Sequence, residues 1–421
     1  MRKTPTESSL DYPGWLVVIA AFTGVMVSFA AMVPYTFSLF LEPLEGAFGW
    51  KREAISQAFA IAALTVAAVS PGIGSLLDRF PPRRIILPCI VVFAAAMASL
   101  SLLSGHIAQF YGTYLMLGIV GNGTAQLAYS RAVLTWFERR RGLAFAIVLT
   151  GSGTGSILLP LVAQHVILSY GWRAAYLALG ACALIGLPLT ALLVRNRPVA
   201  PATVVQHAQP AKRIGPVLRT RVFWVISVFV MLAAFSMNAA IAHLAALLTG
   251  RGITPSSAAI ALSVLGISTI AGRLVTGPLL DRLFAPLVAL VVLLVSAAGI
   301  MTLAYATTAT AGIIGTSLMG FGAGSEADVV PYLIAKYFGR SRFSTLYGLS
   351  WTAYAIGAAT GPVLMGRAFD KAGTYLPGSV ILFAMPLVVA ALLQLLLPRY
   401  ASTDAGEMAD LVIEPAIENA L

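Results

Sequence analysis

The two halves of this chain carry the same short sequences in the same order. Residues 74–79 (Gly-Ser-Leu-Leu-Asp-Arg) return as residues 277–282 (Gly-Pro-Leu-Leu-Asp-Arg), an offset of 203. Residues 136–139 (Trp-Phe-Glu-Arg) return in a related form as residues 337–340 (Tyr-Phe-Gly-Arg), an offset of 201. Such a repeat predicts a duplicated domain whose two copies share one succession of elements.

Both copies lie in a chain that is too apolar for a water-soluble protein. Hydrophobic residues make up 59% of its 421 residues, charged residues make up 10%, and the mean hydropathy is +0.88. A soluble domain carries about 25% charged residues, and a helix needs about 20 apolar residues to cross a bilayer. We therefore expect an all-α protein in a lipid bilayer. Twelve spanning helices are predicted at residues 15–40, 54–77, 85–104, 107–135, 143–168, 174–194, 222–248, 258–280, 285–306, 309–334, 345–365 and 378–397.

The longest polar segment divides these helices into two pseudo-symmetric bundles of six. We expect a cytoplasmic N-terminus (1–13), a first bundle (14–194), a cytoplasmic linker (195–221), a second bundle (222–398) and an acidic cytoplasmic tail (399–421). Most of the 27 Lys and Arg residues lie at the chain ends and in loops on one side of the predicted bundles. The positive-inside rule therefore predicts a cell inner membrane protein with both termini in the cytoplasm. Although the net charge is +11, no basic patch remains for a nucleic-acid partner.

Motifs of several chemical classes are missing from the sequence. It contains no P-loop, no zinc-ligand spacing and no nucleophile elbow. We therefore expect no ATP hydrolysis, no enzyme activity, no metal and no cofactor. Internal repeats in membrane proteins are typical of transporters, in which the substrate binds between the repeats.

The first copy of the repeated loop resembles a known family signature. Residues 74–84 are similar to the loop between helices 2 and 3 of the major facilitator superfamily, and the resemblance covers about residues 14–398. It implies a conformational latch, in which the glycines allow close helix approach and the charged residues pair at the helix ends. Pro81 stands where the family usually has glycine, and an ordinary capped loop is the alternative interpretation. The latch residues are Gly74, Asp78, Arg79, Gly277, Asp281 and Arg282.

Five further stretches are similar to the monocarboxylate transporter branch and its relatives, the oxalate/formate exchangers. They are residues 11–15, 35–44, 136–144, 272–274 and 347–351. The resemblance implies a secondary transporter that moves a small organic monocarboxylate by alternating access, accompanied by a proton, and acts as a monomer. Carboxylate exchange, export of a hydrophobic compound and a non-transporting membrane sensor are the alternatives. Residues 151–155 lack the Gly-Pro pair of the antiporter motif, which disfavours drug export.

Four charged residues are predicted at membrane depth: Arg131, Arg273, Glu326 and Asp328. An ionisable group there is costly unless it pairs or faces water, so each is a candidate for function. Arg273 matches the arginine that binds the substrate carboxylate in the monocarboxylate transporter family, and its planar guanidinium suits a carboxylate. The alternative is that Arg273 extends its side chain to the membrane surface.

The two acids are predicted to carry the coupled proton, since a carboxyl group held away from water can exchange a proton near neutral pH. Glu326 and Asp328 are two residues apart on one helix and point about 200° apart, so only one should face the pore. Asp328 shares a face with Tyr332. A structural ion pair, for instance with Arg131, is the alternative.

Polar and aromatic residues complete the predicted substrate site. On one continuous helix, Arg131 would lie about opposite Asn122 and away from Gln126, so the three could not face one cavity. Aromatic residues at positions 347, 351 and 354 form a stripe. The residues predicted to bind substrate are Arg273, Tyr35, Tyr332, Trp351, Tyr354, Asn122, Gln126 and His243.

Two of these predictions carry further expectations. Tyr354 aligns with a lysine of the oxalate exchangers, so a pocket for one negative charge with an apolar or hydroxylated body is implied. His243 can donate to substrate or titrate, but a histidine satisfied by a neighbouring carbonyl is the more common arrangement.

Overall fold

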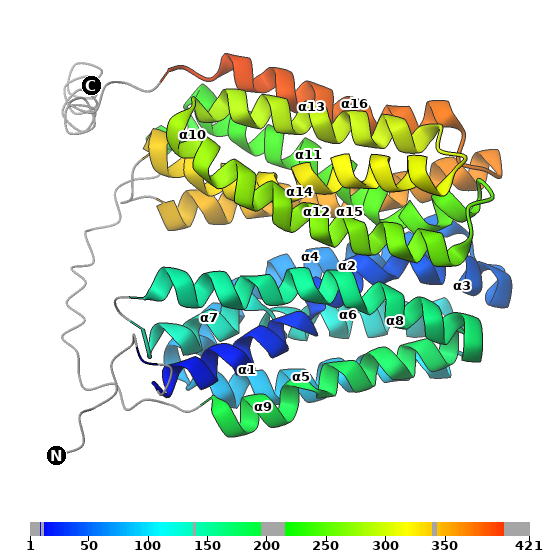
Figure 1. The fold of residues 1–421 in the computed structure, drawn as a ribbon, viewed down its shortest axis with the longest axis horizontal. Coiled ribbons are helices and arrows are strands. Elements are labelled where there is room, and N and C mark those ends of the chain that lie inside the picture. The colour runs from blue at the N-terminus through cyan, green and yellow to red at the C-terminus, as the bar shows by residue number, and fades with distance from the viewer. Residues whose placement is uncertain (1–8, 10–11, 138–139, 195–214, 339–342, 400–421) are drawn as a thin grey trace.

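The computed structural model of this chain describes residues 9, 12–137, 140–194, 215–338 and 343–399. Every regular element in these ranges is a helix. The helices form two groups that stand side by side, one from each half of the chain (Figure 1). The start of α1 and the end of α16 lie at the same end of the long axis, which we call the terminal side; the opposite end is the far side.

Within the described residues, the first half forms six membrane-spanning helical segments, each of which we call a rod whether it is one helix or several short ones in line. The opening rod is a chain of short pieces, and the long α8 contains two rods that meet at Gly171, whose φ of 83° breaks the helix. The elements are α1 (Gly14–Met26), α2 (Phe29–Thr36), η1 (Phe37–Phe40), α3 (Leu41–Phe48), α4 (Arg52–Arg79), α5 (Pro82–Ser99), η2 (Leu100–Leu102), α6 (Ile107–Thr124), α7 (Gln126–Leu134), α8 (Arg141–Leu184) and α9 (Gly186–Leu193).

The second half makes six more rods. Its elements are α10 (Gly215–Leu218), α11 (Arg221–Thr249), α12 (Pro255–Arg282), α13 (Ala285–Ala304), α14 (Ala309–Phe338), α15 (Phe343–Ala372), α16 (Pro377–Leu393) and η3 (Gln394–Leu396). The duplication is visible in their bounds, because α4 and α12 both span 28 residues and are offset by 203 at each end. The predicted twelve-helix, two-bundle fold is therefore confirmed.

Not all rods are equally apolar. Within the described residues, eight stretches are long and apolar enough to cross a membrane by length and composition alone, one of them covering both rods of Leu143–Leu193. The rods outside this set are α6 with α7, α14 and α15. These three are interrupted or rich in Gly, Ser and Thr. Polar groups thus concentrate on a few helices, and α14 and α15 belong to the candidate site described below.

The fourth rod corrects one expectation. A continuous helix over residues 107–135 was assumed, but α6 ends at Thr124 and α7 begins at Gln126, with extended backbone at Ala125 (φ −92°, ψ −176°). The glycines at positions 121 and 123 have low helix propensity. The Thr124 hydroxyl donates to the Gly121 carbonyl (2.9 Å), and it accepts from the Phe29 backbone N–H (3.4 Å). The predicted angles between Asn122 of α6 and the two α7 residues, Gln126 and Arg131, therefore do not hold.

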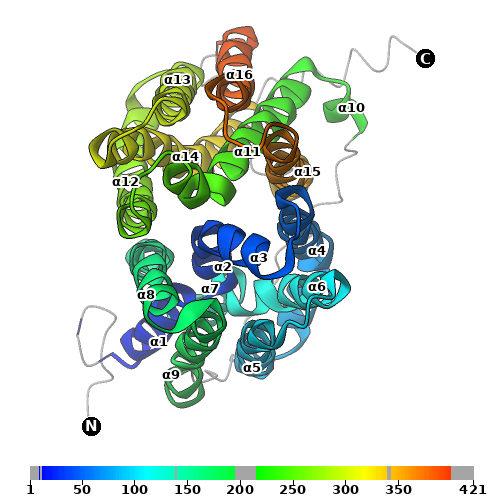
Figure 2. The ribbon, with the colours of Figure 1, turned by 90° about the vertical axis from the view of Figure 1, so that its right-hand side faces the viewer.

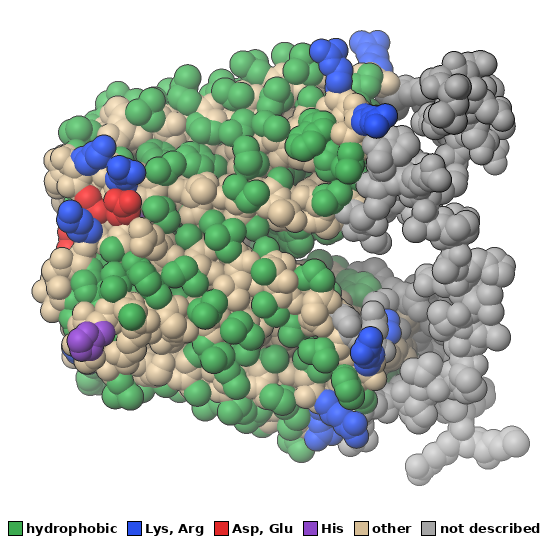
Figure 3. Space-filling model, turned by 180° about the vertical axis from the view of Figure 1, so that it is seen from behind, with side chains coloured by type: hydrophobic (Ala, Val, Ile, Leu, Met, Phe, Trp, Pro, Cys, Tyr) green, Lys and Arg blue, Asp and Glu red, His purple; other side chains and the backbone are tan. Residues whose placement is uncertain are grey.

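The two halves meet on the far side and part on the terminal side. Viewed from the far side, α3 and α4 lie beside α11 and α15, and α8 lies beside α12 (Figure 2). In space-filling view the halves are joined where charged side chains gather, and a hollow separates them toward the terminal side (Figure 3). The protein is therefore in a state that is closed on its far side.

The glycines of the predicted latch make no close contact in this state. A Cβ atom at Gly74 or Gly277 would meet nothing within 4 Å. The close approach expected of them stays a prediction for a state in which the terminal side is closed. Both glycines lie toward the terminal ends of α4 and α12, where the halves are apart. Arg79 and Arg282 are exposed, while the side chains of Asp78 and Asp281 lie outside the described part of the structure.

Candidate functional site

Arg273 of α12 carries a buried polar atom that no group satisfies. Its Nε has no hydrogen-bond partner within the described residues. Tyr35 of α2 lies within electrostatic reach of Arg273 and beside the Thr269 hydroxyl, one turn earlier on α12. The Thr269 hydroxyl itself donates to the Leu265 carbonyl (2.8 Å). A cation with spare hydrogen-bonding capacity therefore stands where the two halves meet.

Glu326 of α14 lies at the same depth as Arg273. The parallel helices α12 and α14 are in register, because Gly324 packs on the Thr269 backbone and the Thr276 and Ser325 hydroxyls share a hydrogen bond (2.6 Å). The Glu326 side chain is buried, and its Oε1 has no hydrogen-bond partner among the described residues. One unsatisfied cation and one unsatisfied acid thus occur at one level of the second half.

Glycines hold these two helices close together. A Cβ atom at Gly272 would lie 2.0 Å from the Phe321 carbonyl oxygen, and one at Gly324 would lie 2.0 Å from the Thr269 carbonyl oxygen. No side chain fits at such distances, so only glycine permits this approach. The close packing fixes the position of Arg273 relative to Glu326.

The predicted aromatic stripe is present on α15. The Trp351 ring contacts both Tyr347 (centroids 6.0 Å apart) and Tyr354 (4.5 Å). The Tyr354 hydroxyl accepts a hydrogen bond from Asn238 Nδ2 of α11 (3.4 Å) and lies within electrostatic reach of Glu326 and Tyr35. The stripe therefore joins the group around Arg273 and Glu326.

Two residues of this group were not identified from the sequence. Thr269 could have been identified from its position, because it precedes Arg273 by one helical turn and shares its face. Asn238 is a polar residue in a strongly apolar helix, where a polar group usually has a partner or a function.

The candidates on the fourth rod lie elsewhere. Asn122 of α6 donates through Nδ2 to the Val66 carbonyl (3.0 Å) and to the Ser70 hydroxyl, both on α4. It therefore joins two helices of the first half. Gln126 and Arg131 of α7 have exposed side chains.

Two other candidates, Tyr332 and His243, also lie away from Arg273. Tyr332 lies beneath the Lys336 ammonium, which is 5.6 Å from its ring centroid. His243 is fully buried near the far end of α11, about 7.5 Å along the helix from Asn238. Its Nε2 lies 2.9 Å from the Pro362 carbonyl, so the alternative with a satisfied histidine describes this site. The side chain of Asp328 lies outside the described part of the structure.

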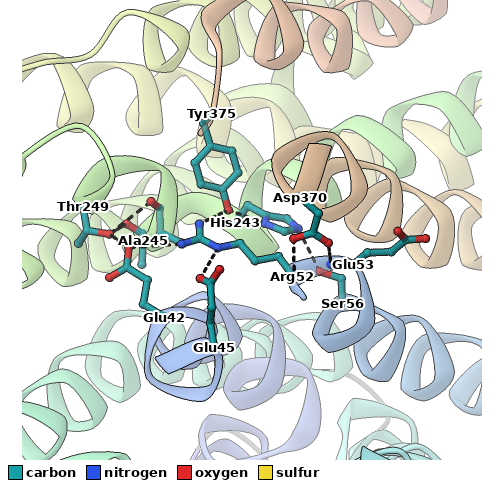
Figure 4. Close-up of polar contacts among 11 residues, drawn as sticks. Glu42, Glu45, Arg52, Glu53, Ser56, His243, Ala245, Thr249, Asp370 and Tyr375 are labelled. Atoms are coloured by element: carbon teal, nitrogen blue, oxygen red, sulfur yellow. Dashed lines mark hydrogen bonds and ion pairs between the residues drawn. The ribbon is translucent and has the colours of Figure 1, made fainter. Parts of the chain in front are cut away.

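His243 belongs to a second polar group, which we call the far-side lock (Figure 4). Its centre is Arg52, the first residue of α4, whose side chain is only 6% exposed. Arg52 donates to Glu45 (2.9 Å) of its own half and to the Tyr375 hydroxyl (2.8 Å) of the other half. The members of the lock are Glu42, Glu45, Arg52, Ser56, His243, Thr249, Phe369, Asp370 and Tyr375.

The direction of the hydrogen bonds through His243 follows from the chemistry of its neighbours. Burial raises the pKa of Tyr375, which lies in the loop between α15 and α16, so the phenol keeps its proton. Since its oxygen accepts from Arg52, its proton is free for His243 Nδ1 (2.8 Å). The Pro362 carbonyl can only accept, so it receives the Nε2 proton. The chain of donors therefore runs from Arg52 through Tyr375 and His243 to Pro362.

The described residues contain no group of three or more His, Cys, Asp or Glu side chains that could hold a metal ion.

Two duplicated six-helix halves, with polar groups between them, are the architecture of a membrane transport protein. The chain belongs to the Major Facilitator Superfamily, whose family model matches residues 14–362. It is 27% identical over 408 residues to monocarboxylate transporter 13 of Bos taurus, covering 95% of this chain and 93% of that protein. It is 28% identical over 380 residues to monocarboxylate transporter 11 of Mus musculus, covering 86% and 82%.

The likeness extends to solved structures. A bacterial homolog of the human lysosomal transporter Spinster has the same fold, with a TM-score of 0.75 at 16% identity, over 92% of this chain and 97% of that chain. The family model confirms the predicted family, and this structure shares its fold.

Proposed function

We propose that this protein is a secondary active transporter of a small organic monocarboxylate, with Arg273 as the carboxylate anchor. The observation that carries the proposal is the buried Arg273 Nε without a hydrogen-bond partner, beside a tyrosine of the opposite half. A guanidinium can form two parallel hydrogen bonds with one carboxylate, and a buried donor gains most from such a partner. The similarity to two monocarboxylate transporters supports the same substrate class.

The geometry supports alternating access around this anchor. Arg273 lies nine residues before the terminal end of α12, about 13 Å from it along the helix. The hollow between the halves opens on that side. Tyr35 comes from the first half and Arg273 from the second, so a bound carboxylate would be in reach of both. Binding would therefore favour closure of the terminal side and allow the far side to open.

Glu326 is proposed as the carrier of a coupled proton. It is the buried acid at the depth of Arg273, and it makes no ion pair among the described residues. A carboxyl group there can carry a proton through the closed state and release it when the site opens to water. Movement of substrate and proton together would make the cycle responsive to a pH gradient.

A binding screen tests the substrate class first. The purified protein is heated with members of a panel of mono- and dicarboxylates, since a ligand that binds only the folded state adds about 2.7 kcal/mol of stability at a concentration of 100 Kd. We expect monocarboxylates with an apolar or hydroxylated body to raise the melting temperature. Proteoliposomes loaded with buffer then report uptake of the best ligand under an imposed pH gradient. If no monocarboxylate binds and none is taken up, the proposal is wrong.

A further inference from the structure

The far-side lock contains a helix cap that crosses between the two halves. Asp370 of α15 accepts hydrogen bonds from the backbone N–H groups of Arg52 (2.9 Å) and Glu53 (2.8 Å), the first two residues of α4. These N–H groups have no partner within their own helix. Lys51, at the N-cap position, provides no side-chain hydrogen bond. The second half of the protein therefore supplies the cap of a helix in the first half.

From this arrangement we propose that Asp370 and Arg52 form the latch that keeps the far side closed, and that release of this cap sets how often the far side opens. The inference rests on the alternating-access part of the proposed function, but not on the identity of the substrate.

Arg52 is held by the second half through both its backbone and its side chain. Its guanidinium lies 3.6 Å from the centroid of the Phe369 ring and donates to Tyr375, while Asp370 holds its N–H group. Phe369 and Asp370 are neighbours at the end of α15. If α15 moved away from α4, the three contacts would break in one step. The lock should therefore open as a unit.

The contacts that remain after opening stay within the first half. Arg52 Nε keeps Glu45 Oε2 at 2.9 Å, and its Nη2 keeps Glu42 Oε1 at 3.9 Å. The freed Asp370 carboxylate and the two N–H groups would be hydrated at the surface, so no buried polar group is stranded. A contact of this kind can break and form again. A latch requires this reversibility, whereas a permanent contact between the halves does not.

Two further contacts join the halves beside the latch. The Ser56 hydroxyl lies 3.1 Å from His243 Nε2, and the Thr249 hydroxyl donates to Glu42 (2.5 Å). A cavity of about 190 Å³ lies beside Glu42 and Thr249 and is lined by both halves. Ala245 of α11 lines this cavity and is 3% exposed. A thiol at that position would be protected while the lock is closed.

The test measures how often this cavity opens. Cys89 and Cys182 are replaced by alanine, and Ala245→Cys supplies a single reporter thiol in lipid nanodiscs. Asp370→Asn removes the charge that caps α4. Glu53→Gln is the matched control, because it removes one negative charge at the same helix start, and its side chain points away from the lock (Figure 4). We expect Asp370→Asn to speed maleimide labelling about tenfold, equivalent to 1.4 kcal/mol, and Glu53→Gln to leave it unchanged.

A second variant applies the same test without a change of charge. A Cβ atom at Gly366 would lie 2.7 Å from the backbone C and O atoms of Arg52, so Gly366→Ala should force α15 away from the start of α4. Gly348→Ala, on the same helix with nothing within 4 Å, is its control. Gly366→Ala should also speed labelling, while Gly348→Ala should not.

The outcomes separate the latch from general instability. Size-exclusion profiles and melting temperatures show which variants fold, and Gly366→Ala decides the matter if Asp370→Asn does not fold. Labelling that is no faster in the folded variants than in their controls overturns the latch. Because labelling needs no substrate, it can succeed even if the carboxylate screen fails, and the two proposals stand or fall separately.

Discussion

The Tyr35 hydroxyl of the first half lies beside the Thr269 hydroxyl of the second half, one helical turn before Arg273. This contact brings the halves together at the depth of the proposed substrate anchor. It differs from the far-side lock, where charged groups and backbone make the contact. A ligand on Arg273 would therefore lie next to Thr269, where the second half contacts the first.

The first prediction concerns the anchor. Arg273→Gln removes the charge, and Arg273→Lys removes the planar pair of donors, so both should lower carboxylate uptake. We expect a loss of about 10- to 100-fold, since a hydrogen bond to a charged group contributes about 1.5–3 kcal/mol. Uptake is measured in proteoliposomes. Arg367→Gln, at an exposed position of α15, is the control. Normal uptake by both Arg273 variants would remove the proposed role.

The second prediction concerns charge selectivity. Tyr354 gives the pocket a neutral phenol, bonded to Asn238, where a second carboxylate would need a cation. An unpaired buried carboxylate is costly, so monocarboxylates should stabilise the protein more than dicarboxylates of similar size. Thermal denaturation with both classes measures this. Greater stabilisation by oxalate or malonate than by lactate-like acids would reverse the conclusion.

The third prediction concerns the proton. Glu326→Gln should abolish uptake driven by a pH gradient, while exchange of substrate across the membrane continues, because exchange needs no net movement of protons. Asp328→Asn is the comparison, and only one of the two amides should show this pattern, since positions two residues apart on a helix lie on different faces. Unimpaired pH-driven uptake in both variants would argue for proton-independent exchange.

The fourth prediction separates two tyrosines that the sequence placed in one site. Tyr35→Phe removes the hydroxyl that lies beside Thr269 and Arg273, and a hydrogen bond from such a hydroxyl to substrate would contribute about 0.5–1.5 kcal/mol. The concentration of carboxylate needed for half-maximal uptake should therefore change by up to about tenfold. Tyr332→Phe should leave it unchanged, because that ring stacks under Lys336. Equal effects in the two variants would contradict this assignment.

The fifth prediction concerns the packing that positions Arg273. Gly272→Ala would place a methyl group against the Phe321 carbonyl oxygen, and overpacking of this kind costs about 1–3 kcal/mol. Gly277→Ala on the same helix meets nothing within 4 Å and should gain up to about 1 kcal/mol from helix propensity. Melting temperatures should therefore fall in the first variant and hold or rise in the second. A shared fall in both would show that α12 tolerates no alanine for another reason.

The architecture was predictable because its signals are local and repeated. Hydropathy located the twelve rods, and the offset of 203 between residues 74–79 and 277–282 is the offset between α4 and α12. The break at Ala125 was missed because the two glycines that precede it lower helix propensity without determining where a helix stops.

The candidate site was predicted in part. Arg273, Glu326 and the stripe at Tyr354 stood out because charge and aromatic periodicity can be seen in one helix at a time. The far-side lock could not be found in this way. Arg52 and Asp370 are 318 positions apart, and each resembles an ordinary charged residue at a helix end. Only the packing of the two halves brings them together.

The helix cap at α4 has a consequence for how such proteins diverge. Asp370 contacts main-chain N–H groups, which every residue except proline provides. Residue 53 can therefore be replaced during evolution without any compensating change at position 370. A search for co-varying residue pairs among relatives would miss the contact between Asp370 and the residue 53 backbone, even where the carboxylate is retained. Comparison of related sequences would therefore reveal the fold more readily than it would reveal this part of the closing mechanism.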